Sequence, residues 1–279
     1  MSRLILNVNF VVLLGLGCVA LETRADAATV AYWRFEEGAG STASDSSGFG
    51  NTGIINQGNL QNSDVPVSLV PATGELNNFS LQLNGSGQFV IAADSPSLRP
   101  ENAITIEAYV KLAGNVIGNA AIVGRQLSNT HADSFNLGLR GHAGVVGFNY
   151  PFVSLQLGAA SVNVDIDTPL SVGQWYHLAG TWDGSQLKMY LDGNLEGAIA
   201  ATGTISYPQS NPVVLGADNE ASGNLEWFFP GRIDEVRISD AALSPNQFLS
   251  SPVPEPSTLG LLTVGCLAIL AGGMRRRFA

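Results

Sequence analysis

Residues 173–194 read GQWYHLAGTWDGSQLKMYLDGN, three short runs of largely alternating apolar and polar residues separated by two Asp-Gly pairs. Alternation with a period of two is typical of a β-strand that buries one of its faces. Asp-Gly favours a type I′ hairpin turn, because both central residues of that turn have positive φ. The stretch therefore predicts three consecutive antiparallel strands, with type I′ turns at Asp183-Gly184 and Asp192-Gly193.

The same alternation appears in residues 104–112, ITIEAYVKL, where every second side chain is apolar. This pattern predicts a strand that packs on one side and meets water on the other. Similar runs separated by turn residues fill residues 28–249, without a long helical periodicity or a fixed-length repeat. Apart from one short helix predicted from Ser244-Pro245 to Phe248, this region is expected to be an all-β sandwich.

The 279-residue chain has a formal net charge of −10, and only 13% of its residues are charged. Residues 28–252 hold eight basic and twenty acidic residues, so their net charge is −12. Such a domain repels phosphate backbones, which argues against nucleic acid as a partner. Both cysteines, Cys18 and Cys266, lie outside these residues, which excludes a disulfide framework, a thiolate metal site and a thiol nucleophile from them.

The N-terminal residues 1–27 have the order of parts of a signal peptide: a basic start, an apolar run over residues 10–21, and small residues before a cleavage site near Ala27. The apolar run is too short to span a membrane comfortably. A lipoprotein signal acylated at Cys18 is the alternative, but such signals normally have a branched aliphatic residue where this chain has Gly15. We therefore expect cleavage near Ala27 and an exported chain.

The C-terminal residues 250–279 combine three features: Pro254-Glu255-Pro256, an apolar run over about residues 258–274, and Arg275-Arg276-Arg277. The apolar run is just long enough for a transmembrane helix. Because clustered arginines stay on the cytoplasmic side, this helix would hold a chain whose body has already crossed the membrane. An ordinary single-span anchor is the alternative to a sorting function.

This order of parts closely resembles the PEP-CTERM protein-sorting signal of Gram-negative bacteria. The resemblance implies export by the secretion machinery, transient anchoring in the inner membrane, and recognition and cleavage by an exosortase near the Pro-Glu-Pro motif. It also implies delivery to the cell surface or to the extracellular exopolysaccharide matrix. We therefore expect the mature protein to lack most of the segment 250–279.

Four stretches of the middle region carry a second resemblance: AYWRFEEGAGSTASDSSGFGNTG (31–53), SLQLNGSGQFVIAADSPSLRPENAITIEAYVKL (80–112), GQWYHLAGTWDGSQLKMYLDGN (173–194) and GRIDEVRISDAALSP (231–245). In this order they resemble the LamG-like jelly-roll domains of the concanavalin A-like lectin/glucanase superfamily. The resemblance implies a two-sheet antiparallel jelly roll, an all-β sandwich whose first and last strands are neighbours in one sheet. The chain departs from the family pattern at Tyr109, where Trp is more usual.

The loop DSSGFGN (45–51) offers carboxylate, hydroxyl, amide and backbone oxygens, the ligands that calcium prefers. In IDEVRI (233–238) the apolar alternation breaks, which predicts a β-bulge at Asp234-Glu235 that re-aims one carboxylate. The family resemblance implies a structural calcium (Ca2+) near the terminal strands, with Asp45, Asn51 and Asp234 close together and Glu36 as a further ligand. The alternative stays open: Asp45 and Asn51 would cap turns, while Asp234 and Glu235 would pair with Arg232, Arg237 or Arg34.

The sequence contains no motif that indicates an enzyme. The Glu-x-Asp-x-x-Glu string of glucanases with this fold does not occur, nor do Gly-x-Ser-x-Gly and HExxH. His177, inside a predicted strand, is expected to be a half-buried sheet residue rather than a general base. Aromatic side chains either serve packing or stack on sugar rings, and the candidates are Tyr150, Phe152, Tyr207 and the run Trp227-Phe228-Phe229.

Together these features predict a non-enzymatic protein of the cell surface or extracellular matrix, a carbohydrate-binding or adhesive module associated with exopolysaccharide. The alternative from another class is a structural or protein-interaction component of the cell envelope that has no glycan ligand. A glycoside hydrolase or lyase with an unfamiliar pair of acids is a minor alternative.

Overall fold

The computed structural model describes residues 29–127, 132–142, 145–219 and 224–251. The predicted signal peptide (1–27), most of the C-terminal segment (252–279) and the predicted transmembrane run therefore lie outside the described residues. Within the described ranges, no helix is long and apolar enough to cross a membrane.

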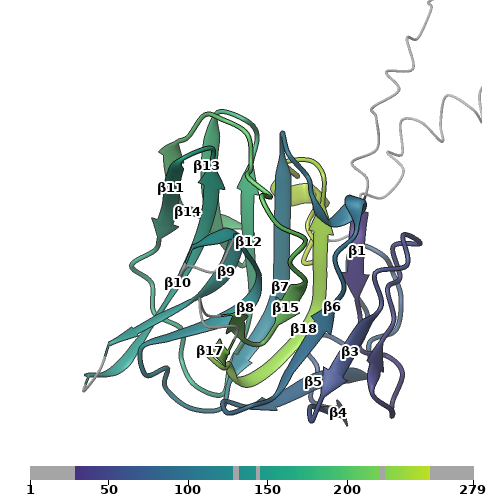
Figure 1. The fold of residues 1–279 in the computed structure, drawn as a ribbon. Coiled ribbons are helices and arrows are strands. Elements are labelled where there is room, and N and C mark those ends of the chain that lie inside the picture. Colours follow the sequence, from purple (N-terminus) through teal and green to yellow (C-terminus); the bar gives the residue numbers. More distant parts are fainter. Residues whose placement is uncertain (1–28, 128–131, 143–144, 220–223, 252–279) are drawn as a thin grey trace, which may run out of the picture.

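The described residues form two antiparallel sheets that pack face to face, which confirms the all-β jelly-roll sandwich (Figure 1). Sheet 1 contains, in spatial order, β14 (Asn194–Ala200), β13 (Gln186–Leu191), β12 (Trp175–Trp182), β7 (Ile104–Leu112), β18 (Pro230–Ser239), β5 (Phe79–Asn84) and β4 (Asn59–Asn62), and β1 (Thr29–Trp33) pairs with β18. Sheet 2 contains β11 (Ala160–Asp165), β10 (Val145–Leu157), β9 (Asp133–His142), β8 (Asn119–Gln126), β15 (Val213–Leu215), β6 (Phe89–Ala92), β3 (Gly53–Asn56) and β2 (Thr42–Ala43). The small hairpin of β16 (Asp218–Asn219) and β17 (Leu225–Glu226) lies beside β8.

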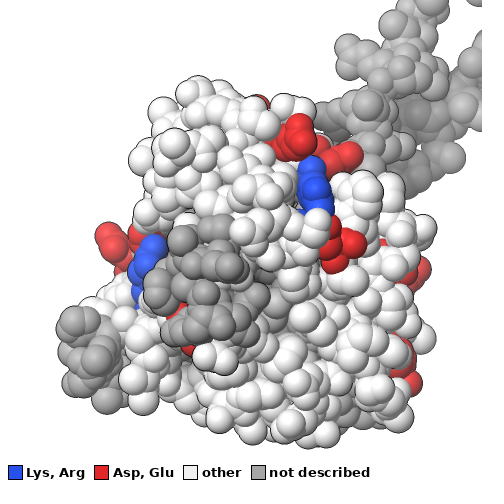
Figure 2. All heavy atoms as spheres, viewed as in Figure 1, with Lys and Arg blue, Asp and Glu red and all other residues white. Residues whose placement is uncertain are grey.

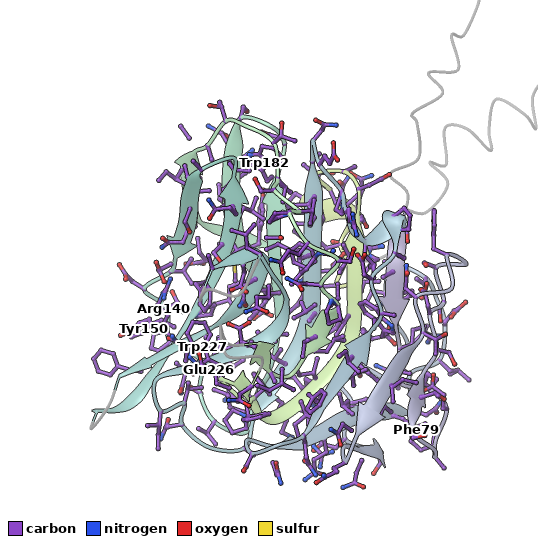
Figure 3. The ribbon with its side chains drawn as sticks, viewed as in Figure 1. Phe79, Arg140, Tyr150, Trp182, Glu226 and Trp227 are labelled. Carbon is purple, nitrogen blue, oxygen red and sulfur yellow. The ribbon has the colours of Figure 1, made fainter. Side chains whose placement is uncertain are left out.

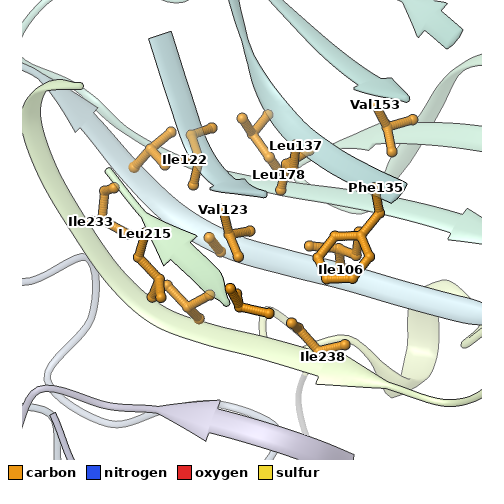
Figure 4. Packing of buried hydrophobic residues seen from close by; sticks show 14 of the residues in the cluster. Ile106, Ile122, Val123, Phe135, Leu137, Val153, Leu178, Leu215, Ile233 and Ile238 are labelled. Carbon is orange, nitrogen blue, oxygen red and sulfur yellow. The ribbon is translucent and has the colours of Figure 1, made fainter. Parts of the chain in front are cut away.

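The core lies between the two sheets and consists of the side chains that alternate inward along each strand (Figure 4). Ile106 and Ile233 of sheet 1 meet Val123 and Phe135 of sheet 2 in this layer, and all four are fully buried. Each strand therefore presents its other side chains on an outer face, directed away from the second sheet. Those two outer faces are where function can be placed.

The strands over 173–194 appear as predicted, but only one of the two turns is of the predicted type. Asp192 and Gly193 both have positive φ, at 48° and 79°, as a type I′ turn requires. The loop between β12 and β13 has three residues. The φ angle of Gly184 is positive, but that of Asp183 is not, although a type I′ turn would require both to be positive. Here the Asp183 Oδ1 accepts hydrogen bonds from the backbone N–H of Ser185 and Gln186, so its side chain shapes the turn and type I′ was wrong.

Strand β7 spans the predicted residues, yet the prediction that one of its sides meets water is wrong. Thr105 and Glu107 are fully buried on the outer face, and Tyr109 is nearly so. The chain after β18 covers them: Leu243 N–H donates to Thr105 Oγ1 at 2.8 Å, and Leu249 N–H donates to Glu107 Oε2 at 2.9 Å. A segment distant in the sequence thus removes from water a face whose pattern indicates exposure.

Two local predictions in the last part of the domain are confirmed. The pairing of β18 with β7 shifts between Asp234 and Arg237, and Glu235 has a φ of 50°, which is the predicted β-bulge. The predicted short helix is a single 3₁₀ turn, η2 (Pro245–Gln247), matched by one more turn at η1 (Pro96–Leu98). The antiparallel pairing of β1 with β18 places the first and last strands side by side.

Candidate functional site

Asp45 and Asn51 belong to one tight loop, where their polar atoms hold the backbone. Asp45 Oδ1 accepts from Tyr32 N–H at 2.9 Å, and Oδ2 accepts from Asn51 N–H at 2.8 Å. The buried Asn51 amide donates to Val30 O at 2.7 Å and accepts from the Ser95 hydroxyl at 2.6 Å. These contacts correspond to the turn-capping alternative, and they tie the loop to β1 and to the residues before η1.

Asp234 and Glu36 lie in a second group, assembled by two neighbouring asparagines. Asn77 Nδ2 donates to Asp234 Oδ2 at 2.9 Å, and Asn78 donates to Glu36 from its backbone N–H at 2.8 Å and from Nδ2 at 2.9 Å. Asp234 is fully buried, and burial, followed by the charge of Glu235, raises its pKa well above the usual range. Asn77 Oδ1 is buried without a hydrogen-bond partner.

The two groups differ in their fitness for calcium. In the loop 45–51, the Asp45 and Asn51 side-chain oxygens already accept hydrogen bonds, so this loop does not need a cation. Both Asp234 oxygens also accept hydrogen bonds, from Asn77 Nδ2 and from Glu235 N–H. Here, however, the Asn77 amide oxygen is buried without a partner, and the buried Asp234 carboxylate forms no ion pair with a basic residue of the described chain. Carboxylate and amide oxygens are calcium ligands, so the residues here fit the ion.

Glu235 follows Asp234 and completes a buried acidic pair. Tyr32 OH donates to Glu235 Oε2, and Arg34 Nε lies 3.4 Å from Oε1, so of the predicted partners Arg34 is the one that pairs. Burial is the largest influence and raises the pKa of Glu235 to about 7, against the lowering effects of Tyr32 and Arg34. Arg232 pairs with Asp64 at 2.5 Å and Arg237 Nε with Glu107 at 2.7 Å, and not with the acidic pair.

His177 is fully buried, so the prediction of a half-buried residue is wrong. Its Nε2 lies 2.8 Å from Glu107 Oε2, and its ring contacts those of Tyr109 and Phe248 at centroid distances of 4.9 and 5.8 Å. The cause is again the C-terminal segment, which brings Phe248 over this part of sheet 1. His177 therefore serves an internal polar network.

On sheet 2, aromatic side chains gather on the outer face of β10. Phe148, Tyr150 and Phe152 alternate along the strand and so share that face, and the first two rings meet edge to face at 5.3 Å. Arg140 of β9 lies opposite Tyr150, and its guanidinium stacks on Phe152 at 4.3 Å from the ring centroid (Figure 3). Asp165 forms an ion pair with Arg140 and thereby fixes this stack.

A cavity of about 140 Å³ opens beside these rings. Trp227 forms one wall, in the unusual φ of 49° for a bulky residue, and its carbonyl accepts from Ala121 N–H at 2.8 Å. Arg140 lines the same cavity as Trp227, and Figure 3 labels both residues. Further lining comes from Ala132, Asp133, Phe152, Ser154, Ser161 and Asn163. We call this surface, with Tyr150 at its edge, the β9–β11 face.

Two acidic side chains meet at the end of this face. Asp133, which lines the cavity, is in hydrogen-bond contact with the buried Asp218 side chain, and Asn136 Nδ2 donates to Asp133 Oδ2 at 2.9 Å. Burial, and then the charge of Asp218, raises the pKa of Asp133 well above its usual range. Asn136 Oδ1 is buried and has no partner. Sequence reasoning missed this pair, because nothing in either segment marks the two residues as neighbours.

The other aromatic candidates serve packing. Tyr207 donates from its hydroxyl to Pro100 O at 2.9 Å, and its ring lies under Arg125. Phe229 is fully buried in the core between the sheets. Of the run at 227–229, Trp227 is the residue that lines the cavity.

The fold and the tail each match a known family. The family described as the concanavalin A-like lectin/glucanases superfamily matches residues 77–247, and the PEP-CTERM protein-sorting motif matches residues 252–277. The chain belongs to the concanavalin A-like lectin/glucanase superfamily. The sorting motif contains both the Pro-Glu-Pro sequence and the arginine cluster, and it marks this superfamily member as an exported protein. No curated protein matches the chain in sequence.

Solved structures of domains from other proteins share the fold. Domain 4 of AbnA, a GH43 extracellular arabinanase from Geobacillus stearothermophilus, solved with arabinotriose, has a TM-score of 0.57 and 19% identity over 80% of this chain and 97% of that one. The binding domain of Paraclostridial mosquitocidal protein 1 has a TM-score of 0.56 and 15% identity, and the match covers 78% of this chain and 50% of that one. The binding domain of botulinum neurotoxin DC with rat synaptotagmin II has a TM-score of 0.54 and 12% identity over 78% and 49%. At these identities the likeness shows the fold alone.

The raised pKa of Glu235 makes stability depend on pH. A carboxyl whose pKa is higher in the folded than in the unfolded chain loses stability as pH rises from the unfolded to the folded pKa, here from 4.5 to about 7. Glu235→Gln should remove up to about 3 kcal/mol of that loss, measured by urea unfolding between pH 4.5 and 7.5 with chelator present. Glu75→Gln, which changes the exposed partner of Arg34, is the control. Equal pH slopes for the wild type and Glu235→Gln would contradict this assignment.

Proposed function

We propose that this exported protein is a non-enzymatic binding module that holds carbohydrate on its β9–β11 face. The observation that carries the proposal is the cavity at Trp227, where aromatic walls stand beside uncharged polar side chains. Sugar rings have an apolar face that stacks on an aromatic ring, and hydroxyls that exchange hydrogen bonds with amides and hydroxyls. Asn163, Ser154 and Ser161 provide such groups next to Trp227.

The face is held rigid before a ligand arrives, which reduces the entropy cost of binding. Phe152 is nearly fully buried beneath Arg140, whose ion pair with Asp165 restrains the guanidinium. The Trp227 carbonyl is bound to β8, so the indole is placed by the sheet and not by a free loop. A fixed indole beside a fixed polar floor favours one orientation of a sugar ring.

The charge pattern supports a ligand rich in hydroxyls. All eight lysine and arginine residues of 28–252 form ion pairs with acidic side chains. In Figure 2 the few blue side chains adjoin red ones within a surface that is otherwise largely uncharged. The domain therefore has no unpaired lysine or arginine that could bind a highly charged polyanion at this face.

The acidic pair at the cavity does not fit glycoside hydrolysis. Retaining enzymes hold their two carboxyl groups about 5–5.5 Å apart and inverting enzymes hold them farther apart. Asp133 and Asp218 are in direct hydrogen-bond contact with each other, which leaves no room for the scissile bond or a water between them. This geometry favours a binding role, in keeping with the arabinotriose complex of the AbnA domain, a likeness of fold.

The sorting motif supports a place for this binding module outside the cell. We propose that an exosortase cleaves the chain near Pro254-Glu255-Pro256 and that the domain then acts at the cell surface or in the exopolysaccharide matrix. A structural or protein-interaction component of the envelope is the alternative. The Trp227 cavity favours the glycan-binding role over it.

We further propose that calcium binds beside Asp234 and stabilises the domain. Asp234, Asn77 Oδ1 and Glu36 would hold the ion, which supplies the positive charge that the buried Asp234 carboxylate lacks. The ion's role there would be structural, because β1 and β18 meet at this site in sheet 1, whereas the β9–β11 face belongs to sheet 2.

Loss of the indole should abolish most glycan binding. Trp227→Ala is expected to weaken binding to isolated native exopolysaccharide at least tenfold, and Tyr150→Ala several-fold, because each loses a stacking surface. A glycan array followed by calorimetric titration provides the measurement. Phe49→Ala removes a more exposed aromatic ring outside this face and is the control. Unchanged binding in both variants would reject the face, and retention by envelope proteins alone would favour the structural alternative.

Calcium should raise the melting temperature relative to chelator, because an ion bound only by the folded state stabilises it by about 2.7 kcal/mol at one hundred times its Kd. The increase is expected to disappear in Asp234→Asn and to persist in Asp45→Asn. Differential scanning calorimetry with calcium and with EDTA measures both. A shift that survives in Asp234→Asn but is lost in Asp133→Asn would place the ion at the other acidic pair.

Cleavage of the tail is tested on the protein isolated from the native cell surface. Mass spectrometry should find a mature chain that lacks Arg275, Arg276 and Arg277. Replacement of Pro254-Glu255-Pro256 by alanines should leave the tail attached. An intact arginine tail on the native surface protein would contradict sorting and indicate a plain membrane anchor.

A further inference from the structure

A second cavity, of about 230 Å³, lies on sheet 1 where β5, β7 and β18 run side by side. Lys111 and Arg232 line it, and each alternates with a core residue of its strand, Val110 and Ile233. Both cations therefore lie on the outer face of sheet 1, directed away from sheet 2 and from the β9–β11 face. Gln82, Val172 and Gly173 complete much of the wall.

Two cations share a single carboxylate in this cavity. Asp64 Oδ1 lies 2.8 Å from Lys111 Nζ and Oδ2 lies 2.5 Å from Arg232 Nε, while Trp175 Nε1 also donates to Oδ1 at 3.2 Å. The local charge is therefore positive, in a domain whose net charge is strongly negative. The Asp64 side chain is one-third exposed, so solvent and ligands can reach the group that it forms with Lys111 and Arg232.

Another pair of cations shares a carboxylate, but in a different setting. Arg99 and Arg125 both bind Asp94, and Arg125 is completely buried. That cluster therefore presents one cation to solvent. At Asp64 both cations line the cavity, with side chains 19% and 25% exposed.

Donors remain available after Asp64 is bound. Arg232 Nη1 has no hydrogen-bond partner although it is buried, and an unsatisfied buried donor costs free energy. The Lys111 ammonium has three N–H groups, and the structure assigns it one acceptor, Asp64. A second carboxylate beside Asp64 would accept from these donors and complete their hydrogen bonding.

We propose that this cavity binds the carboxylate of an acidic sugar unit, such as a uronate, at Arg232 and Lys111. The choice of a sugar as the source of the carboxylate rests on the proposed function, whereas the carboxylate site itself does not. Apolar contacts from Val172 and the open backbone at Gly173 leave space for a ring beside the charged group. Asp64 acts as an internal competitor, since it holds the same two cations and repels a second anion.

Titration with sodium glucuronate, followed by NMR or calorimetry, tests the site. Glucose is titrated as the neutral sugar for comparison, and N-acetylalanine as a carboxylate of the peptide type. Lys111→Gln and Arg232→Gln should each weaken glucuronate binding at least tenfold. Lys188→Gln is the matched control, because Lys188 pairs with Asp183 on the same sheet and is similarly exposed, 27% against 25%. Asp64→Asn should tighten binding several-fold, an effect that a purely structural ion network would not produce.

No glucuronate binding in either the wild type or Asp64→Asn overturns the proposal, and so does binding that persists in Lys111→Gln. Stronger binding of N-acetylalanine than of glucuronate would replace the sugar by a peptide carboxylate. Melting curves show whether each variant is folded. If Arg232→Gln does not fold, the test is made with Lys111→Gln alone. Trp227→Ala should leave glucuronate binding unchanged, so failure of the β9–β11 face and failure of this cavity are distinguished.

Discussion

The buried carboxylate of Glu107 holds the central part of the sandwich together. It accepts from Arg237 Nε at 2.7 Å, from Leu249 N–H at 2.9 Å, and pairs with His177 Nε2 at 2.8 Å. Burial opposes its ionisation, yet Arg237 foremost and then His177 hold its pKa below the usual range. Because β7 lies between β12 and β18, this single side chain joins three neighbouring strands and the C-terminal segment. Removal of one partner from such a network typically costs about 3–5 kcal/mol, because a charge is left buried and unpaired.

The consequence for function is an asymmetry between the two outer faces. The C-terminal segment, drawn onto sheet 1 by Glu107, covers Tyr109 and His177 with Phe248 and Leu249. Sheet 1 therefore keeps an open cavity at the Asp64 end, whereas sheet 2 carries its aromatic residues on the β9–β11 face. Because this covering segment directly precedes the sorting motif, cleavage within that motif would leave the network intact.

The sequence pattern could predict most of the strands, because alternation depends on local burial alone. The residues 104–112 and the bulge at Asp234-Glu235 follow directly from it. The pattern gave a wrong prediction where exposure or turn type depends on residues outside the local run. The outer side of β7 is covered by residues far along the chain. The Asp183 carboxylate determines the turn in which it lies. The pairing of Asp133 with Asp218 was unpredictable for the same reason, since neither segment contains any sign of the other.

Asp234 and Asp133 share an arrangement in which the oxygen of a neighbouring asparagine amide has no hydrogen-bond partner. The fully buried Asp234 and the half-buried Asp133 each accept from an asparagine amide, Asn77 or Asn136, whose own Oδ1 has no partner. Burial raises the pKa of both carboxyls, which favours the protonated form of each where no cation is bound. Protons and cations compete for the same oxygens, and metal affinity therefore falls as pH falls. The stabilisation that the proposed calcium would give this domain is therefore expected to depend on pH, and to be greatest where the carboxyls would otherwise have to ionise without a partner.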